Sequence, residues 1–360
     1  MIEKKVAQSP NYPVVPLKYE EIRVAAVQMN PKPVDPKNPA KGIKENLDHM
    51  LFLCEAAFIW PPDPRGVQLL AFPEFTLTGF DTHWTREEWL KIAIMVPGME
   101  TELIGQKAKE LGCYIEFASH TQDPGWPGHF FNTSLIVSPE GKVIHTHWKA
   151  YYNFPGWNCL EYSTTVHDVL DEFIERYGWE AVWPVARTDI GNIATFICSE
   201  GFAPETARAF AMNGAEILVR SIANGGYIYD DLPGVGDIRL RMRSDCVANH
   251  VYGIYANSDG GNILIKGKKM PESAGGGGSM IIDPSGRILS EANDTREQIV
   301  HATIPIASFR SKHEPPRIRT EIYAPVLEQH LGPVPPNLYL KYLPTNVEDA
   351  LKWSLKHIRK

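Results

Sequence analysis

Three short segments carry side chains that could act together on a carbonyl group. Glu74 lies in Phe72-Pro73-Glu74-Phe75, Lys149 closes the segment His147-Trp148-Lys149, and Cys198 precedes a Ser-Glu-Gly turn. A thiolate is a strong nucleophile, a carboxylate can take its proton, and an ammonium can stabilise negative charge that develops during attack. These residue types therefore fit covalent catalysis by a cysteine.

Each of the three residues also has an ordinary structural interpretation. A glutamate or a lysine after a strand is commonly a surface charge, and a cysteine is most often a small buried apolar side chain. Cys198 departs from this pattern because it ends the strand-like run 192–198 and precedes a turn into a helix near residues 203–213. Such a strand–turn–helix junction can present a nucleophile on an elbow, with backbone N–H groups nearby for an oxyanion.

Taken together, the three segments resemble the nitrilase superfamily of carbon–nitrogen hydrolases in order and spacing. The cysteine segment is most similar to the aliphatic amidase and formamidase branch. An acid stands two residues after Cys198, and Gly201, Pro204-Glu205 and Arg208 follow. The runs 211–220 and 278–286 also match, so the resemblance covers about residues 22–310.

The resemblance implies a role for each residue. Cys198 attacks the carbonyl carbon, Glu74 takes and returns the proton, and Lys149 stabilises the oxyanion together with the backbone N–H of Ser199. A thioester forms and is then hydrolysed by water, and no metal or cofactor is implied. The substrate class would be a small amide or nitrile.

One position departs from the family pattern. Amidases of this family carry a second glutamate eight residues after the lysine, where this chain has Trp157. The next acid is Glu161, twelve residues after Lys149. Two interpretations stay open: an offset loop lets Glu161 serve, or the group is missing.

Other residues near the three segments are candidates for supporting roles. Glu205 and Arg208 are expected to form an ion pair that supports the elbow. The aromatic residues after Lys149 indicate a pocket wall for a less polar or planar substrate, or ordinary packing. The candidate pocket residues are Phe75, Tyr152, Trp157 and Glu200.

Strand-like and helical segments alternate through most of the chain and would have to position these residues. Apolar runs of strand length occur near residues 22–29, 67–72, 113–119, 192–198 and 216–220, and runs with helical spacing lie between them. Residues 132–138 and 142–147 flank a Pro-Glu-Gly turn and predict a hairpin. This alternation predicts an α/β fold with helix-covered sheets, and the resemblance implies a four-layer αββα sandwich.

We predict a single domain over residues 22–310. It is preceded by an extended, proline-containing arm at 1–21 and followed by a tail at 311–360 that is rich in proline and aromatic residues. The tail could wrap a neighbouring subunit or lie on its own surface, and the resemblance implies a homo-oligomer to which the tail contributes. Residues 158–187 look like an insertion, either a lid or pocket wall or a surface decoration.

Composition narrows the partners and the compartment. The 360 residues are 43% hydrophobic and carry a formal net charge of −7, with scattered positive charges, so neither nucleic acid nor an anionic membrane is expected as a partner. None of the five cysteines forms a C-x-x-C pair, which argues against a disulfide scaffold or a structural zinc site. With no signal-peptide pattern and no long apolar run, a cytoplasmic location is expected.

Three functions remain compatible with the sequence. The first is an amidase acting on a small amide, and the second is a nitrilase or N-carbamoyl amine hydrolase that uses the same three residues. The third is a catalytically silent binding or assembly protein, although all three positions are filled. His145 and His147 alternate on a strand, but no third ligand clusters with them, so a metal site is not predicted.

Overall fold

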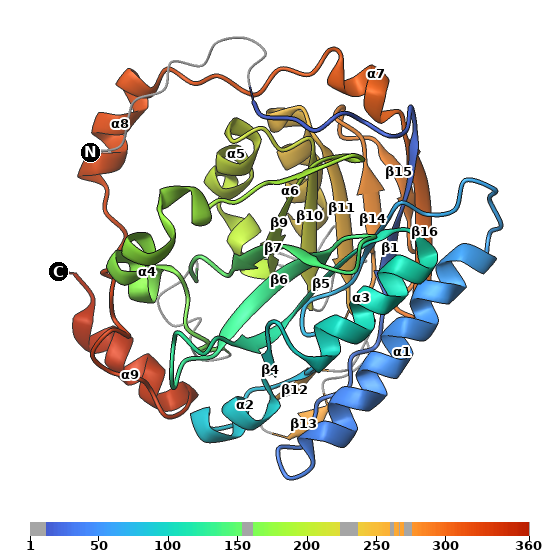
Figure 1. Ribbon diagram of the computed structural model, residues 1–360. Helices are drawn as coiled ribbons and strands as arrows, with labels where there is room; N and C mark the ends of the chain where they lie inside the picture. Colours follow the sequence, from blue (N-terminus) through green and yellow to red (C-terminus); the bar gives the residue numbers. More distant parts are fainter. Residues whose placement is uncertain are drawn as a thin grey trace.

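The computed structural model describes residues 12–152, 161–223, 237–259, 263–265, 267–269 and 276–359. Within them the main chain forms two large β-sheets that pack face to face, each covered on its outer side by helices (Figure 1). The predicted α/β fold and the αββα arrangement are confirmed.

The first sheet is mixed and has the order β16-β1-β2-β5-β6-β7, with β4 paired to β5. Helices α1 and α3 lie side by side on its outer face (Figure 1). The predicted hairpin is present, since β6 and β7 pair in antiparallel fashion. Its elements are β1 (Ile22–Gln28), α1 (Pro39–Ile59), β2 (Leu69–Ala71), β4 (Ile94–Met95), α3 (Met99–Leu111), β5 (Tyr114–Gln122), β6 (Phe131–Val137), β7 (Val143–Trp148) and β16 (Gln298–Ile304).

The second sheet has the order β15-β14-β11-β10-β9-β8, with parallel pairing among β9, β10 and β11. Helices α5 and α6 cover its outer face (Figure 1), where they share an apolar cluster with β9 and β10. Its elements are β8 (Ala186–Thr188), β9 (Gly191–Ile197), α5 (Pro204–Met212), β10 (Ile217–Ile222), α6 (Asp237–Asn249), β11 (Tyr252–Asn257), β14 (Met280–Ile282) and β15 (Ile288–Glu291).

The space between the sheets is filled by branched apolar side chains that alternate along the strands. Val24 of β1, Leu69 of β2, Val219 of β10 and Ile254 of β11 belong to this inner cluster and are almost fully buried. Burial of such side chains stabilises the fold by about 2 kcal/mol each. The packing of the two sheets also fixes the ends of β2, β7 and β9 relative to one another. The candidate residues follow these strand ends.

The segment after Lys149 and the end of the tail form an additional layer at one side of the sandwich. Helices α4 (Leu170–Tyr177) and α9 (Val347–His357) belong to it, with the short turns η2 (His167–Val169) and η3 (Trp179–Ala181). Their apolar side chains pack together in one cluster, here called the side cluster, which includes Trp148, Phe173, Leu338, Tyr339 and Trp353. The described residues 161–187 are therefore covered by the chain's own C-terminal segment.

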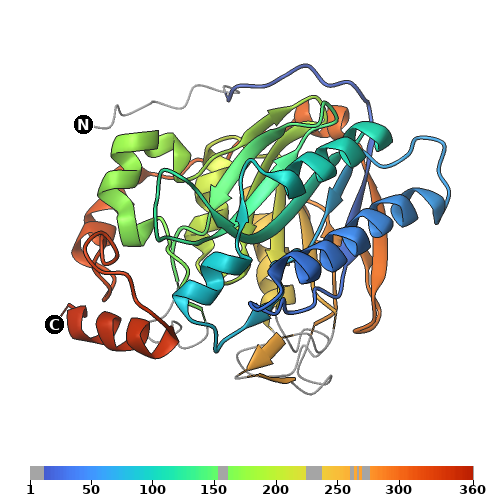
Figure 2. The same cartoon turned by 60° about the horizontal axis from the view of Figure 1, so that its bottom comes forward.

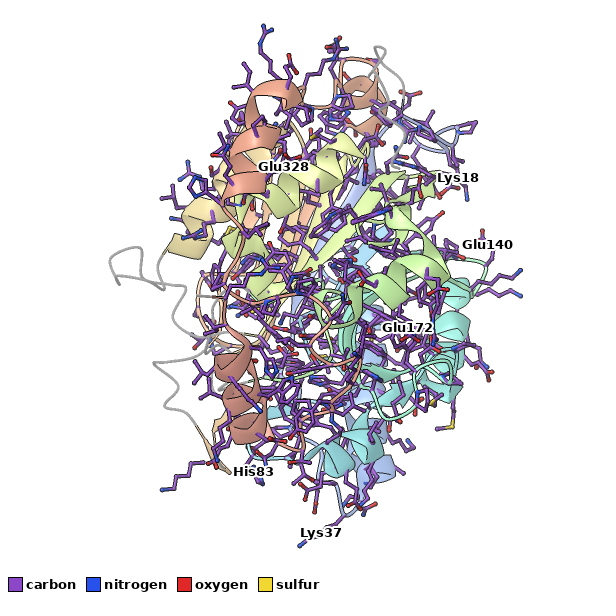
Figure 3. The ribbon with its side chains drawn as sticks, turned by 90° about the vertical axis from the view of Figure 1, so that its left-hand side faces the viewer. Lys18, Lys37, His83, Glu140, Glu172 and Glu328 are labelled. Atoms are coloured by element: carbon purple, nitrogen blue, oxygen red, sulfur yellow. The ribbon has the colours of Figure 1, made fainter. Side chains whose placement is uncertain are left out.

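The two ends of the chain are tied to the sandwich differently. The backbone N–H of Lys18 in the arm donates to Asp189 O at 2.8 Å, and Arg310 of α7 (Ile306–Arg310) donates to Val15 O at 2.7 Å. Helix α8 (Thr320–Gln329) lies at the edge of the molecule and buries none of its side chains (Figures 1 and 2). Figure 3 places Glu328 of α8 and Glu172 of α4 on the side where α9 also packs.

The remaining elements are short. A small sheet of order β13-β12-β3 joins β13 (Lys268–Lys269), β12 (Ile263–Ile265) and β3 (Phe80–Asp81), next to α2 (Arg86–Ile92). Among the described residues, no helix combines the length and apolar character needed to span a membrane. The tail is partly helical, at residues 320–329 and 347–357.

Candidate active site

The three candidate residues lie at the ends of strands from both sheets and meet in one place. Glu74 follows β2, Lys149 follows β7, and Cys198 follows β9. Lys149 Nζ donates to Glu74 Oε1 at 3.0 Å, and the Glu74 carboxylate lies near enough to the Cys198 thiol to raise its pKa. All three side chains are buried, so a sulfur, a carboxylate and an ammonium share one poorly solvated environment.

Two turns at the site hold non-glycine residues in the left-handed region. Cys198 has φ of 45° and Phe75, directly after Glu74, has φ of 63°. Such conformations cost energy for residues with a Cβ and often occur at functional sites. The sharp turn after β9 is η4 (Cys198–Phe202), which leads into α5, as the elbow pattern predicts.

Glu161 completes a charged cluster with the same lysine. Lys149 Nζ donates to Glu161 Oε2 at 2.8 Å, and Ser163 Oγ donates to Glu161 Oε1 at 2.8 Å. His120 Nε2 lies 3.6 Å from Glu161 Oε1. Of the two interpretations of the departure at Trp157, the structure favours the offset loop, because Glu161 reaches Lys149. Trp157 itself lies outside the described residues.

Asn132 of β6 joins the two carboxylates and was not identified from the sequence. Its Nδ2 donates to Glu74 Oε1 at 2.7 Å and to Glu161 Oε1 at 2.9 Å. The backbone N–H of Lys149 donates to Asn132 O at 2.8 Å, which places β6 next to the lysine. An amide side chain near the start of a strand-like segment was the available signal, because a buried amide needs polar partners.

The two carboxylates have opposite pKa shifts. Burial raises the pKa of Glu74 above its usual range, and the Glu161 charge raises it further, although Lys149 and Asn132 oppose both effects. For Glu161, burial alone would also raise the pKa, but Lys149 and His120 lower it well below its usual range. Glu161 is therefore the permanent counter-ion, whereas Glu74 is the more basic carboxylate of the pair.

The cation and the thiol are affected by the same neighbours. Burial alone would lower the pKa of Lys149, but Glu161, Glu74 and Cys198 raise it above its usual range, so the ammonium stays protonated. Burial raises the pKa of the Cys198 thiol, and Glu74 raises it further, while Lys149 and Arg220 act in the opposite direction. The resting pair is thus a thiol beside a carboxylate, with an ammonium in contact.

The elbow is supported by Arg220 rather than by the expected ion pair. Arg220 Nε and Nη2 donate to Cys198 O at 3.0 and 2.5 Å from the fully buried strand β10. Gly201 allows this approach, since a Cβ there would lie 2.4 Å from Arg220 Cζ. Glu205 and Arg208 form no ion pair in the described part of the chain, because Glu205 is solvent-exposed at the start of α5. That expectation was wrong.

Glu200 differs from its expected place in the pocket. Its carboxylate is fully buried and accepts hydrogen bonds from His147 and from two backbone N–H groups. Its side chain is thus fully engaged within the protein. The turn residue Ser199 is also buried and directly follows the nucleophile candidate.

Aromatic rings line the other side of the charged cluster. Tyr152 lies with its ring centroid 5.3 Å from Lys149 Nζ, and its hydroxyl contacts Ser163. Phe75 stacks on His120 with the ring centroids 4.8 Å apart, next to Phe80. Both predicted pocket residues therefore adjoin the charged cluster, and Phe75 also helps to enclose His120.

The two alternating histidines of β7 have separate partners. His145 Nε2 lies 3.0 Å from Thr195 Oγ1, and His147 Nε2 lies 3.0 Å from Glu200 Oε2. Burial lowers the pKa of His145 to about 3, so it is neutral. Among the described residues, no group of three or more histidine, cysteine, aspartate or glutamate side chains could hold a metal ion.

This geometry meets the requirements of covalent carbonyl chemistry. A buried thiol lies near a basic carboxylate, and a protonated amine donates a hydrogen bond to the same carboxylate. In a buried site such charges interact more strongly than in water.

Comparisons with known proteins agree on one family. A family model described as carbon–nitrogen hydrolase matches residues 23–314. Among curated proteins, the formamidase of Helicobacter acinonychis is 31% identical over 203 residues, which is 56% of this chain and 53% of that protein. A formamidase of Bacillus cereus is 32% identical over 160 residues, 43% of this chain and 41% of that protein. The chain thus spans about half the length of these relatives or less.

Solved structures share the fold. A mutant of the amidase from Nesterenkonia, of the nitrilase superfamily, has a TM-score of 0.61 at 18% identity and covers 85% of this chain and 97% of that one. Saccharomyces cerevisiae Nit3, a member of branch 10 of the nitrilase superfamily, has a TM-score of 0.60 at 21% identity, with coverage of 85% and 96%.

Proposed function

The chain belongs to the carbon–nitrogen hydrolase family, and from this we propose that it hydrolyses a small amide to a carboxylic acid and ammonia through a thioester on Cys198. The observation that carries the proposal is that the buried Glu74 carboxylate accepts a hydrogen bond from the Lys149 ammonium at 3.0 Å and also raises the pKa of the buried Cys198 thiol. The formamidase relatives favour an amide over a nitrile or a carbamoyl amine as substrate.

The first half of the cycle forms the thioester. Cys198 Sγ attacks the amide carbon while its proton passes to Glu74. The oxyanion is stabilised by the Lys149 ammonium and the backbone N–H of Ser199. When the tetrahedral adduct collapses, the C–N bond breaks and Glu74 returns the proton to the leaving nitrogen, so that ammonia departs.

The second half regenerates the thiol. A water molecule gives a proton to Glu74 and attacks the thioester carbon, and the C–S bond then breaks. The carboxylic acid leaves and Cys198 recovers its proton. The raised pKa of Glu74 supports this double role, because a more basic carboxylate accepts a proton more readily near neutral pH. Glu161 keeps Lys149 charged and in place throughout.

The test measures ammonia release and the covalent adduct together. The protein is offered a panel of short aliphatic amides, nitriles and N-carbamoyl amines, and ammonia is quantified while intact-protein and peptide masses are recorded. The expected result is ammonia from the amides and an acyl mass on the Cys198 peptide. The panel also separates the three substrate classes, because each class is offered in its own reaction and ammonia then shows which class is hydrolysed.

Two variants complete the test. Cys198→Ala is expected to abolish both ammonia release and the adduct. Cys54→Ala removes a buried free cysteine of α1, away from the site, and is expected to keep both. Unchanged turnover in Cys198→Ala would overturn the role of Cys198, and a wild-type protein inert to the whole panel would favour a binding or assembly protein instead.

A further inference from the structure

The Glu200 carboxylate is bonded to the backbone on both sides of the candidate site. Oε2 accepts from the Ile197 backbone N–H at 2.7 Å, and Oε1 accepts from the Ala150 backbone N–H at 2.7 Å. Ile197 directly precedes Cys198, and Ala150 directly follows Lys149. One side chain therefore joins the residue before the nucleophile to the residue after the lysine.

His147 holds the same carboxylate from a third direction. His147 Nε2 lies 3.1 Å from Oε1 and 3.0 Å from Oε2, and neither side chain is exposed to solvent. The ring packs edge-on against Phe210 of α5, with the centroids 5.4 Å apart. Because buried charges require several donors, this set of contacts fixes where the carboxylate can lie.

The contact crosses from one sheet to the other. Lys149 follows β7 of the first sheet, whereas Cys198 follows β9 of the second. Cross-sheet packing sets the mean spacing of these strands, but it leaves the irregular residues after each strand free to move by small amounts. The Glu200 carboxylate closes this gap with two hydrogen bonds to main chain.

We propose that Glu200 is a positioning residue that sets the distance between the Cys198 thiol and the Lys149 ammonium, an inference that rests on the proposed function. A shift of about 1 Å between reacting groups can lower a rate by about a hundredfold. Glu200 touches neither the thiol nor the ammonium, and it acts through the main chain on either side of them.

The sharpest test is Glu200→Gln, which keeps size and shape. A glutamine has one acceptor oxygen and an NH2 group in place of the second oxygen. That NH2 group would face either the Ile197 or the Ala150 N–H, donor against donor. One of the two main-chain bonds is therefore lost while the packing volume is kept.

The readouts are turnover and the reactivity of Cys198. We expect Glu200→Gln to lower kcat on the best amide of the panel by about a hundredfold, with a much smaller change in KM. The second readout is the rate at which iodoacetamide alkylates Cys198, measured from the mass of the Cys198 peptide at a series of pH values. In Glu200→Gln the pH profile of this rate should shift to higher pH. The reason is that Lys149 lowers the pKa of the thiol and would lie farther away.

Thr195→Val is the matched control. It removes the buried contact between Thr195 and His145, which also joins β9 to β7 but bonds neither residue 150 nor residue 197. This variant is expected to keep the kcat and the alkylation profile of the wild type. If Glu200→Gln does not fold, His147→Ala removes the side-chain donor together with the ring packed against Phe210 but keeps both main-chain bonds, and it should shift the alkylation profile less, in the same direction.

The outcomes separate the two proposals. A Glu200→Gln profile that matches the wild type, or a loss of thermal stability with unshifted alkylation, would overturn the positioning role. So would an equal shift in Thr195→Val. A wild type that releases no ammonia from the panel would instead overturn the proposed function. The alkylation profile would still show whether Glu200 affects the influence of Lys149 on the Cys198 thiol.

Discussion

Glu161 decides how the charges of the site are shared. It contacts Lys149 and, through Asn132, the carboxylate of Glu74. Two carboxylates beside one ammonium cannot be equally basic, and the stronger contacts with Lys149 and His120 keep Glu161 ionised. The remaining electrostatic repulsion acts on Glu74 and makes it the better proton acceptor.

Replacement of Glu161 by glutamine is predicted to change both rate and pH dependence. The Glu161 charge raises the pKa of Glu74, so its removal should lower that pKa and move the acid limb of kcat/KM to lower pH. The rate at neutral pH should fall by about a hundredfold because Lys149 loses a partner that places it. Initial rates across pH check both parts.

Ser163→Ala is the control for this prediction. It removes one hydrogen bond to Glu161 but keeps the charge, so its acid limb should stay near that of the wild type. An acid limb that moves to higher pH in Glu161→Gln would show that Glu161 does not raise the pKa of Glu74.

At the scale of elements, the two sheets are joined by polar contacts as well as by apolar packing. Glu116 of β5 is fully buried and accepts from Ser134 of β6 and from Ser221 of β10, each at 2.7 Å. Its other oxygen, Oε2, has no hydrogen-bond partner among the residues that the structure describes. Burial raises the pKa of Glu116 from 4.5 to about 7, so the carboxyl is protonated below neutral pH.

This shift predicts a pH dependence of stability. Between pH 4.5 and about 7 the folded chain holds the Glu116 proton more tightly than the unfolded chain. The free energy of unfolding therefore falls as pH rises through this range, by about 3 kcal/mol in total from this group, and stays low above it. Glu116→Gln mimics the protonated form, so the free energy of unfolding of this variant should not show this decrease as pH rises.

Urea unfolding of both proteins at about pH 5 and about pH 8 is the measurement. The free energy of unfolding of Glu116→Gln should match that of the wild type at the lower pH and exceed it at the higher pH. Glu328→Gln, an exposed change on α8, should leave the pH dependence as it is. If the free energy of unfolding depends on pH equally in the wild type and in Glu116→Gln, then Glu116 ionises alike in the folded and unfolded states.

At the scale of the whole molecule, the tail divides into two parts. Residues 333–357 cover the insertion, and Tyr339 N donates to Asp168 O at 3.0 Å while Arg86 Nε donates to Pro344 O at 2.5 Å. Helix α8 is different, because Ile322, Tyr323, Val326 and Leu327 are each more than half exposed. A ten-residue helix is marginal in water by itself.

We therefore keep the prediction of a homo-oligomer and assign the tail's contribution to α8. The double change Val326→Lys and Leu327→Lys should lower the mass of the assembly measured by light scattering, because charge would be buried at a subunit contact. Leu355→Lys, on the exposed face of α9, is the matched control and should keep the mass. A monomeric wild type at micromolar concentration would contradict the prediction.

The sequence by itself was sufficient for the family, the α/β layers and the strand ends that carry Glu74, Lys149 and Cys198. These features depend on local pattern: apolar runs of strand length, helical spacing between them, and a turn directly after a cysteine. The main strands and helices occur where those patterns predict them, although several short strands and peripheral helices were missed, namely β3, β4, β8, β12, β13, β15, α2, α7, α8 and α9.

Only the tertiary structure decided which polar side chains meet at the site. Glu161 stands twelve residues after Lys149 in the sequence, and this separation does not determine that the two side chains meet, as they do at 2.8 Å. Glu200 is held by backbone groups of residues 150 and 197, and Asn132 by carboxylates from elsewhere in the chain. A buried polar group takes the direction of its donors and acceptors, and here these partners become neighbours only when the two sheets pack together.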